Sequence, residues 1–170
     1  KSHLAQLYED TGKLKQALAI HQQVYETDLA MLGKNHPNTA GDLNNLASVR
    51  RRLGDYQIAE NLFRKSLDVM ISALGEDSPQ SVSVMNNLAL LLENQGLYDE
   101  AEPLFKKAHT ISGKIQGERH PTTLALLNNL AFLYESQGDF ERSELNYRKV
   151  IQLNTEVFGE SHSNTLSNQN

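Results

Sequence analysis

The sequence predicts an all-α fold in which antiparallel helix hairpins are stacked end to end as a solenoid. Three observations carry this prediction. Glycines recur every 42 residues, prolines and an Asn-Asn-Leu-Ala motif recur at the same interval, and the apolar residues between them are spaced in steps of three and four. A fixed period of this length is typical of tandem repeat proteins. The apolar spacing is that of amphipathic helices.

Two sets of glycines define the repeat, and together they account for eight of the ten glycines in the chain. The first set is Gly12, Gly54, Gly96 and Gly138, and the second is Gly33, Gly75, Gly117 and Gly159. Three prolines keep the same spacing: Pro37, Pro79 and Pro121. Proline favours the first turn of a helix, and glycine favours the position just past its end. Each repeat is therefore predicted to be a pair of helices.

The helices can be placed from these signals and from the apolar stripe formed by residues such as Leu43, Leu46, Ala47 and Leu53. First helices are predicted at 37–53, 79–95 and 121–137, and second helices at 14–32, 56–74, 98–116 and 140–158. Residues 1–11 are expected to end an earlier first helix. The single array then contains repeats at 1–33 (incomplete), 37–75, 79–117, 121–159 and 163–170 (the start of a further repeat). Because both ends interrupt a repeat, we expect an excerpt of a longer protein.

Composition narrows the possible functions. The 170 residues include no cysteine, so disulfide scaffolds, thiolate metal sites and cysteine nucleophiles are excluded for this segment. No apolar run approaches the roughly 20 residues that span a bilayer. The formal net charge of −5 argues against binding to a phosphate backbone. We therefore expect neither nucleic acid nor membrane as a partner, and a cytoplasmic location.

The sequence also predicts that the chain is not an enzyme and holds no cofactor or metal. Its glycines are spread singly and form no phosphate-binding loop. His36, His120 and His162 recur just before helix starts, which makes them loop residues at the repeat spacing instead of a ligand cluster. His21 takes the place of an aromatic residue in the other repeats and is expected to cap an imperfect first hairpin.

The repeat resembles a known family. The tetratricopeptide pattern places an aromatic residue, Leu-Gly, Tyr, Ala and Phe at fixed offsets. The matching positions read Leu43, Leu46-Ala47, Arg50, Ala59, Phe63 in one repeat and Leu127, Leu130-Ala131, Tyr134, Ser143, Tyr147 in another. The period is 42 instead of the usual 34. With its His-Pro start and Asn-Asn-Leu-Ala core, the unit resembles the kinesin-light-chain type of tetratricopeptide repeat.

This resemblance implies a right-handed superhelical solenoid whose concave wall is lined mainly by the first helices. Such a groove is a natural site for an extended peptide or partner segment, from another protein or from the same parent chain. A second reading is a structural or regulatory solenoid that serves as a spacer, an oligomerising surface or an intramolecular clamp in a larger multidomain sensor or effector protein.

Asparagines are the main candidates for binding, because an amide carries both a donor and an acceptor for a ligand backbone. Asparagine ladders are known in this type of repeat, and the resemblance places one at Asn45, Asn87 and Asn129, flanked by Asn44, Asn86 and Asn128. The alternative is that these side chains bond between neighbouring helices and fix their stacking.

Residues further along the first helices are the candidates for selectivity: Ser48, Leu90, Phe132, Arg51, Arg52 and Asn94. Leu90 and Phe132 suggest a pocket for an apolar anchor of the partner, or else they pack against the following repeat. Arg51 and Arg52 suit acidic ligands, although a solvated helix end gives the same pattern. Arg50 occupies a packing position, so its stem is expected to line the core while its head reaches out.

Overall fold

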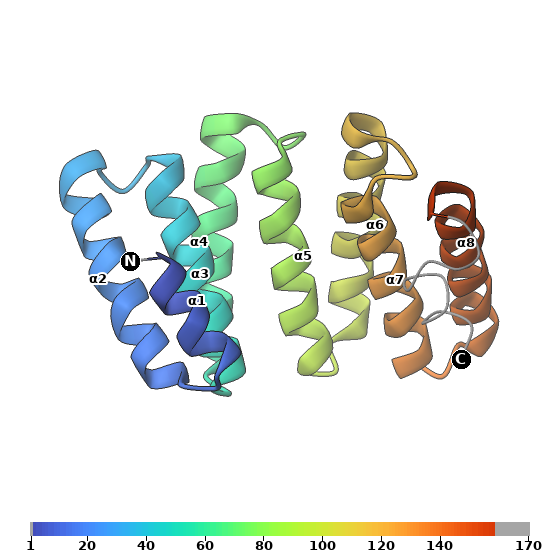
Figure 1. The fold of residues 1–170 in the computed structure, drawn as a ribbon, viewed down its shortest axis with the longest axis horizontal. Coiled ribbons are helices and arrows are strands. Elements are labelled where there is room, and N and C mark those ends of the chain that lie inside the picture. Colours follow the sequence, from blue (N-terminus) through green and yellow to red (C-terminus); the bar gives the residue numbers. More distant parts are fainter. Residues whose placement is uncertain (1, 159–170) are drawn as a thin grey trace. The chain divides into compact units, whose positions relative to one another are not determined.

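The computed structural model describes residues 2–158, and this part of the chain forms eight α-helices without a β-strand (Figure 1). The first helices are α1 (Ser2–Asp10), α3 (Pro37–Arg52), α5 (Pro79–Asn94) and α7 (Pro121–Ser136). The second helices are α2 (Leu14–Leu32), α4 (Tyr56–Leu74), α6 (Tyr98–Gln116) and α8 (Phe140–Phe158). The all-α prediction is confirmed.

The helix bounds follow the predicted register closely. All four second helices begin and end where the sequence places them, and α3, α5 and α7 each end one residue earlier than predicted. The expected further helix at 163–170 lies outside the described residues. The local signals in each repeat are therefore sufficient to set its helices.

The first helices α3, α5 and α7 each begin with a side-chain cap next to a proline. The Nδ1 atom of His36 accepts a hydrogen bond from the backbone N–H of Asn38 at 3.1 Å, and His120 Nδ1 accepts one from Thr122 at 3.2 Å. In the repeat between them, Ser78 Oγ accepts from the N–H of Ser81 at 3.1 Å. His36 and His120, which the sequence predicts to be loop residues, are thus helix N-caps that satisfy a free backbone donor; His162 lies outside the described residues.

Glycine ends the second helices for a conformational reason. Gly33, Gly75 and Gly117 follow α2, α4 and α6 with φ values of 85°, 86° and 95°. A side chain at positive φ meets steric strain that glycine avoids. The glycines that recur every 42 residues therefore mark the positions at which the chain turns after a second helix.

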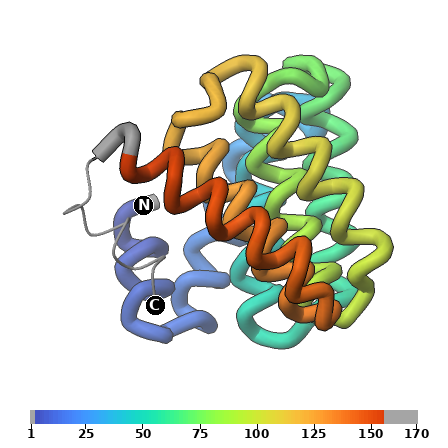
Figure 2. The backbone as a smooth tube through the Cα atoms, turned by 90° about the vertical axis from the view of Figure 1, so that its right-hand side faces the viewer, coloured from blue at the N-terminus to red at the C-terminus, as the bar shows by residue number. Residues whose placement is uncertain are grey.

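The chain divides into two compact units, Lys1–Leu91 and Leu92–Asn170. In the first unit α2 packs against α1 and α3, and α3 packs against α4. In the second, α7 packs against α6 and α8, and Figure 2 traces the return of the chain from α7 (orange) into α8 (red). Within each unit the basic contact is a helix hairpin.

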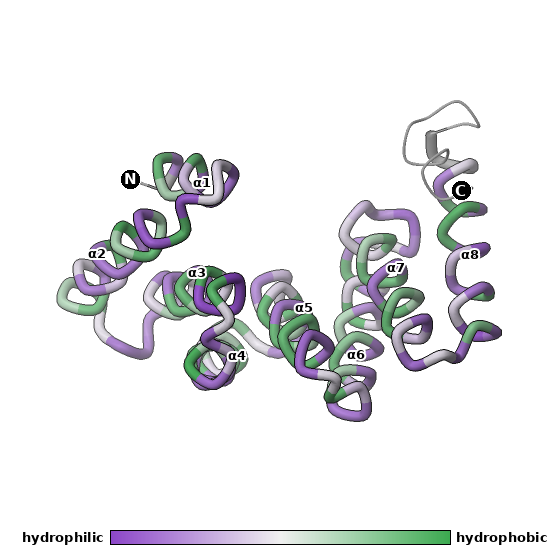
Figure 3. Tube along the Cα trace, turned by 90° about the horizontal axis from the view of Figure 1, so that it is seen from below, coloured by the Kyte–Doolittle hydropathy of each residue, from purple (hydrophilic) through white to green (hydrophobic). Residues whose placement is uncertain are grey.

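Small, aliphatic and aromatic side chains at the repeat positions are buried in each unit. In the first unit Leu46, Ala47 and Phe63 are buried, and in the second unit Leu130 and Phe105 are buried. Hydrophobic and hydrophilic residues alternate along helices such as α4 and α8 (Figure 3), as expected for helices with one buried face. The tetratricopeptide core positions therefore form the core of each unit.

The exposed faces of the second helices carry ion pairs at i, i+4 spacing. These pairs are Glu60 with Arg64 at 2.8 Å, Glu102 with Lys106 at 2.7 Å, and Glu144 with Arg148 at 2.6 Å. Exposed pairs of this kind contribute only a few tenths of a kcal/mol each. These ion pairs lie on solvated faces of the second helices. We therefore search for a binding site on the first helices.

Candidate interaction surface

The Asn-Asn pair lies at the edge of the buried stripe of each first helix. In α3 the following residues Leu46 and Ala47 are buried, whereas Asn45 is exposed and Asn44 is half-buried. Because successive helical residues point about 100° apart, the side chain of Asn45 is turned away from the core. It is the candidate amide that solvent reaches most openly in the first unit.

The structure joins two of the candidate asparagines to each other. Asn87 of α5 donates a hydrogen bond from Nδ2 to Asn44 Oδ1 of α3, at 3.0 Å. The second Asn of one repeat thus contacts the first Asn of the repeat before it. This contact fixes the spacing of two first helices within the first unit, in line with the stacking alternative for this pair.

The second unit carries its pair on α7. Asn128 and Asn129 are both half-buried, and the Oδ1 atom of Asn128 accepts no hydrogen bond within residues 2–158. A buried acceptor without a donor costs about 1–3 kcal/mol. This oxygen is itself buried, so a polar group of a partner reaches it only if the Asn128 side chain moves. Asn86 of α5, in the first unit, is also half-buried.

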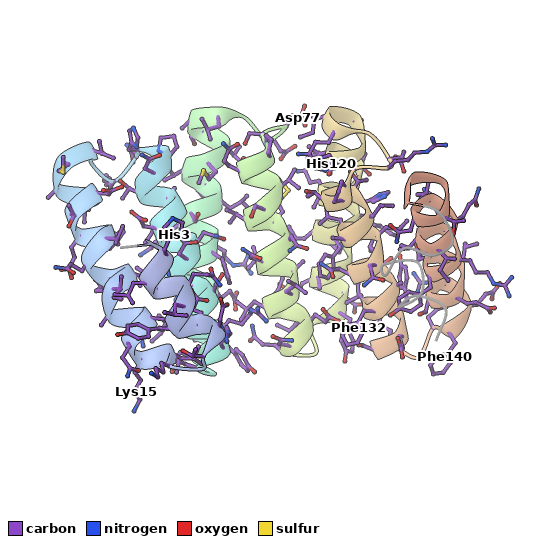
Figure 4. All side chains as sticks on the ribbon, viewed as in Figure 1. His3, Lys15, Asp77, His120, Phe132 and Phe140 are labelled. Atoms are coloured by element: carbon purple, nitrogen blue, oxygen red, sulfur yellow. The ribbon has the colours of Figure 1, made fainter. Side chains whose placement is uncertain are left out.

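The selectivity candidates differ in exposure. Phe132 of α7 exposes 53% of its surface (Figure 4), and several other large apolar side chains, such as Phe140 and Leu145, are more exposed. Leu90 and Ser48 are half-buried. Phe132 is therefore the most open apolar side chain among the selectivity candidates.

The three arginines at the end of α3 have different environments. Arg50 is half-buried and its Nη1 atom binds Asp55 Oδ2 at 2.8 Å, as expected for a stem that lines the core with a head that reaches out. Arg52 is bound to Glu9 at the end of α1, through Nη1–Oε2 at 3.1 Å and Nη2 to the carbonyl oxygen at 2.9 Å. Arg51 is half-buried. Arg52 would have to leave Glu9 to bind an acidic ligand.

The remaining candidate, Asn94, is exposed at the end of α5. Asn94 belongs to the second unit, Leu92–Asn170, whereas the candidates on α3 belong to the first. A partner can reach its amide without displacing core side chains.

A polar cluster replaces part of the apolar core in the first hairpin. His21 of α2 is 8% exposed and its Nε2 lies 2.9 Å from Glu9 Oε1. Asp42 of α3 is buried nearby, and burial raises the pKa of its carboxyl to about 6, helped by the charge of Asp28 and opposed by His21. His21 therefore joins α1 to α2, in place of the simple capping role that the sequence suggests.

A second feature that sequence reasoning misses is a cleft in the second unit, with a volume of about 960 Å³. It lies between the start of α6 and the α7–α8 turn. Its polar wall is organised by Arg142, which binds Glu102 Oε1 at 3.1 Å and Asp139 Oδ2 at 2.6 Å and lies 4.2 Å from the centre of the Tyr134 ring. No single sequence motif predicts this cleft, because its walls come from two turns that are 42 residues apart.

The electrostatics of this cleft wall favour its observed hydrogen bonds. Tyr134 Oη donates to Glu102 Oε1 at 3.0 Å, and burial together with Glu102 raises the pKa of the Tyr134 hydroxyl. The hydrogen bond from Lys106 lowers the pKa of Glu102. Glu102 therefore stays ionised and holds three neighbouring groups.

The same residues offer little for metal chemistry or membrane insertion. Across residues 2–158 we find no group of three or more His, Asp or Glu side chains arranged to hold a metal ion. Nor is any helix of that range both long and apolar enough to cross a bilayer.

Comparison with known proteins identifies one repeat family along the chain. A family model described as tetratricopeptide repeat matches the chain three times, over residues 1–72, 42–111 and 80–156. No curated protein sequence matches the chain at a significant level.

Several solved structures are similar. BtubC (BKLC) from P. vanneervenii matches with 22% identity and a TM-score of 0.79, over 90% of this chain but only 60% of that chain's length. The Podosopora anserina putative kinesin light chain with nearly identical TPR-like repeats matches with 23% identity and a TM-score of 0.86, over 99% of this chain and 80% of that one. MamA protein matches with 14% identity and a TM-score of 0.63, over 95% of this chain and 75% of that one.

Identities this low show the fold alone, so the family rests on the repeat matches. Those matches overlap and together cover nearly all of the described residues. The chain belongs to the tetratricopeptide repeat family.

Proposed function

We propose that this chain binds an extended segment of another protein, or of its own parent chain, along its first helices. Tetratricopeptide repeats generally act as protein–protein interaction modules. The observation that carries the finer proposal is the exposed amide of Asn45 beside the buried pair Leu46 and Ala47. A rigid helix thereby presents a donor and an acceptor to the backbone of a ligand.

Each unit contributes its own binding residues in this proposal. In the first unit Asn45 and Asn87 contact the ligand backbone, while Ser48 and Leu90 contact its side chains. In the second unit Asn129 contacts the backbone and Phe132 supplies an apolar anchor. Burial of an exposed Phe contributes about 1.5–3 kcal/mol, which exceeds the net contribution of about 0.5–1.5 kcal/mol from one neutral hydrogen bond. Phe132 is therefore the expected main source of affinity.

One contact favours the alternative, a structural or regulatory solenoid. The Asn87–Asn44 hydrogen bond already uses two of the candidate amides within the protein. If all the asparagines serve stacking, their loss weakens the fold and leaves partner binding unchanged wherever the fold survives. The two functions therefore predict opposite outcomes for the same substitutions.

The experiment combines Asn45→Ala, Asn87→Ala and Asn129→Ala in one variant. The unmodified protein is first screened on an array of random extended peptides, and the affinities of the bound peptides are measured by fluorescence anisotropy. Peptide binding should weaken about tenfold or more in the triple variant, the sum of several lost hydrogen bonds. Helicity by circular dichroism should stay the same.

Asn61→Ala is the matched control, because Asn61 is exposed on the second helix α4. It should leave both affinity and helicity unchanged. A triple variant that melts at a markedly lower temperature while its peptide affinity is retained would identify the asparagines as stacking groups and contradict groove binding.

A further inference from the structure

The neighbouring helices α2 and α3 depart from their equivalents in later repeats at three positions. Polar, titratable residues stand there in place of mostly apolar ones. His21 replaces Phe63, Phe105 and Tyr147; Asp28 replaces Met70, Ser112 and Asn154; and Asp42 replaces Val84 and Leu126. Because later repeats bury apolar side chains at the Asp42 position, a carboxyl group there needs a physical explanation.

Asp42 lies in an environment that suits a neutral carboxyl group. It is 9% exposed, and its Oδ2 atom receives no hydrogen bond from any described residue. Asp28 stands on α2, which packs against α3, and it is close enough to Asp42 for its charge to raise the pKa of the Asp42 carboxyl. Two carboxylates this close in a buried site repel each other, whereas one proton between them forms a hydrogen bond.

We propose that Asp28 and Asp42 form an acid-dependent latch between α2 and α3. At acidic pH one proton from solvent binds the pair, and the protonated carboxyl donates to the other. At neutral pH the proton is released, the two carboxylates repel, and α2 is held less tightly against α3. This proposal goes beyond partner binding and does not depend on it.

The surrounding charges favour titration of the pair in the weakly acidic range. Burial and, after it, the charge of Asp28 together raise the pKa of Asp42 to about 6, and His21 opposes the shift. Within residues 2–158, Asp28 and His21 of α2 are the charges that act on Asp42. Glu9 of α1 and Arg52 of α3 bind each other beside His21, and Glu9 also binds the His21 ring.

The sign of the effect follows from the folded and unfolded pKa values. The pKa of Asp42 is about 6 in the fold and 3.8 in its ordinary state. The folded protein therefore binds a proton that the unfolded chain has already lost, and stability falls as pH rises through this window. Acidification from pH 7.5 to 5 should close the latch.

The direct test is an NMR titration of the side-chain carboxyl of Asp42 in the unmodified 170-residue chain. The expected midpoint is near pH 6, and Asp28→Asn should move it down, because the like charge is removed and the new amide can donate to Asp42. A midpoint near 4 in the unmodified chain would overturn the proposal, and so would a midpoint that Asp28→Asn leaves in place.

Thermal unfolding and amide exchange give the second readout. From pH 7.5 to 5 the melting temperature of the wild type should rise relative to Asp42→Asn by about 3 °C or more, and amide protection in α2 should rise about tenfold. Asn at position 42 keeps the latch closed at both pH values. Asp68→Asn, at an exposed carboxylate of α4, is the matched control and should behave as wild type. An Asp42→Asn variant with the same pH dependence as wild type would refute the latch.

Discussion

Arg52 of α3 holds the end of α1 by binding Glu9 twice, once through the side-chain carboxylate at 3.1 Å and once through the backbone carbonyl oxygen at 2.9 Å. Glu9 in turn binds His21 of α2 at 2.9 Å. One carboxylate therefore connects three helices of the first unit. α1 is a short helix of 9 residues, and isolated helices of this length are marginal in water.

Arg52→Ala should loosen α1 more than the rest of the first unit. The loss of a partly buried ion pair and a second hydrogen bond should cost about 1 kcal/mol. Hydrogen exchange should show faster exchange in α1 with little change in α4. Arg64→Ala, which removes the exposed pair with Glu60, is the control and should cost less than about 0.5 kcal/mol. Equal effects of the two variants would argue against the Arg52–Glu9 contact.

Two phenylalanines of the second unit should lose very different amounts of stability on truncation. Phe105 is fully buried, whereas Phe132 is 53% exposed. Phe105→Ala should lower the free energy of unfolding by about 3–5 kcal/mol, because it leaves a cavity. Phe132→Ala should lower it by less than about 0.5 kcal/mol. Urea denaturation measures both, and a large loss of stability in Phe132→Ala would indicate that Phe132 packs in the core.

His36→Ala should weaken the start of α3. It removes the Nδ1 acceptor of the Asn38 N–H, and the loss of an N-cap costs about 1 kcal/mol. Since Ser78 caps the next first helix with its hydroxyl, His36→Ser should restore most of the lost stability. Melting temperatures of the three proteins test this, and a serine variant no better than alanine would show that the imidazole acts by packing.

The hydroxyl of Tyr147 should ionise at a more alkaline pH than an ordinary tyrosine. Burial, the hydrogen bond to Glu135 at 3.1 Å and the charge of Glu135 raise its pKa to about 12. Because the folded pKa is above the ordinary 10.0, this group stabilises the fold fully below pH 10, and the contribution is lost as pH rises through 12. An ultraviolet titration of Tyr147→Phe should lack the most alkaline component of the wild-type curve.

The sequence predicts the fold well because its signals are local. Pro37 and Gly75 mark the start and end of a repeat through their own backbone preferences, and the pair Glu60–Arg64 follows from helical spacing alone. None of these inferences needs to know how one repeat lies on the next.

The candidate site is less predictable, because its contacts join repeats with an offset. Asn87 bonds Asn44, and Arg52 bonds Glu9, each across a separation of 43 residues. When the repeats are aligned at their period of 42, each residue is matched with its equivalent and not with the residue that it contacts. The repeat spacing alone therefore does not reveal these pairs. The sequence alone could have shown that Asp42 is exceptional, since it stands where a later repeat has the apolar Val84. That Asp42 lies near Asp28 follows only from the fold.

The helix boundaries set by histidine caps and positive-φ glycines have a consequence for how such a chain can change. A unit whose beginning and end are both encoded within itself can be copied or deleted in frame, and the flanking helices keep their limits. Gain or loss of whole modules should therefore be tolerated far better than an insertion of a few residues inside a helix, which would rotate every later side chain out of its contact.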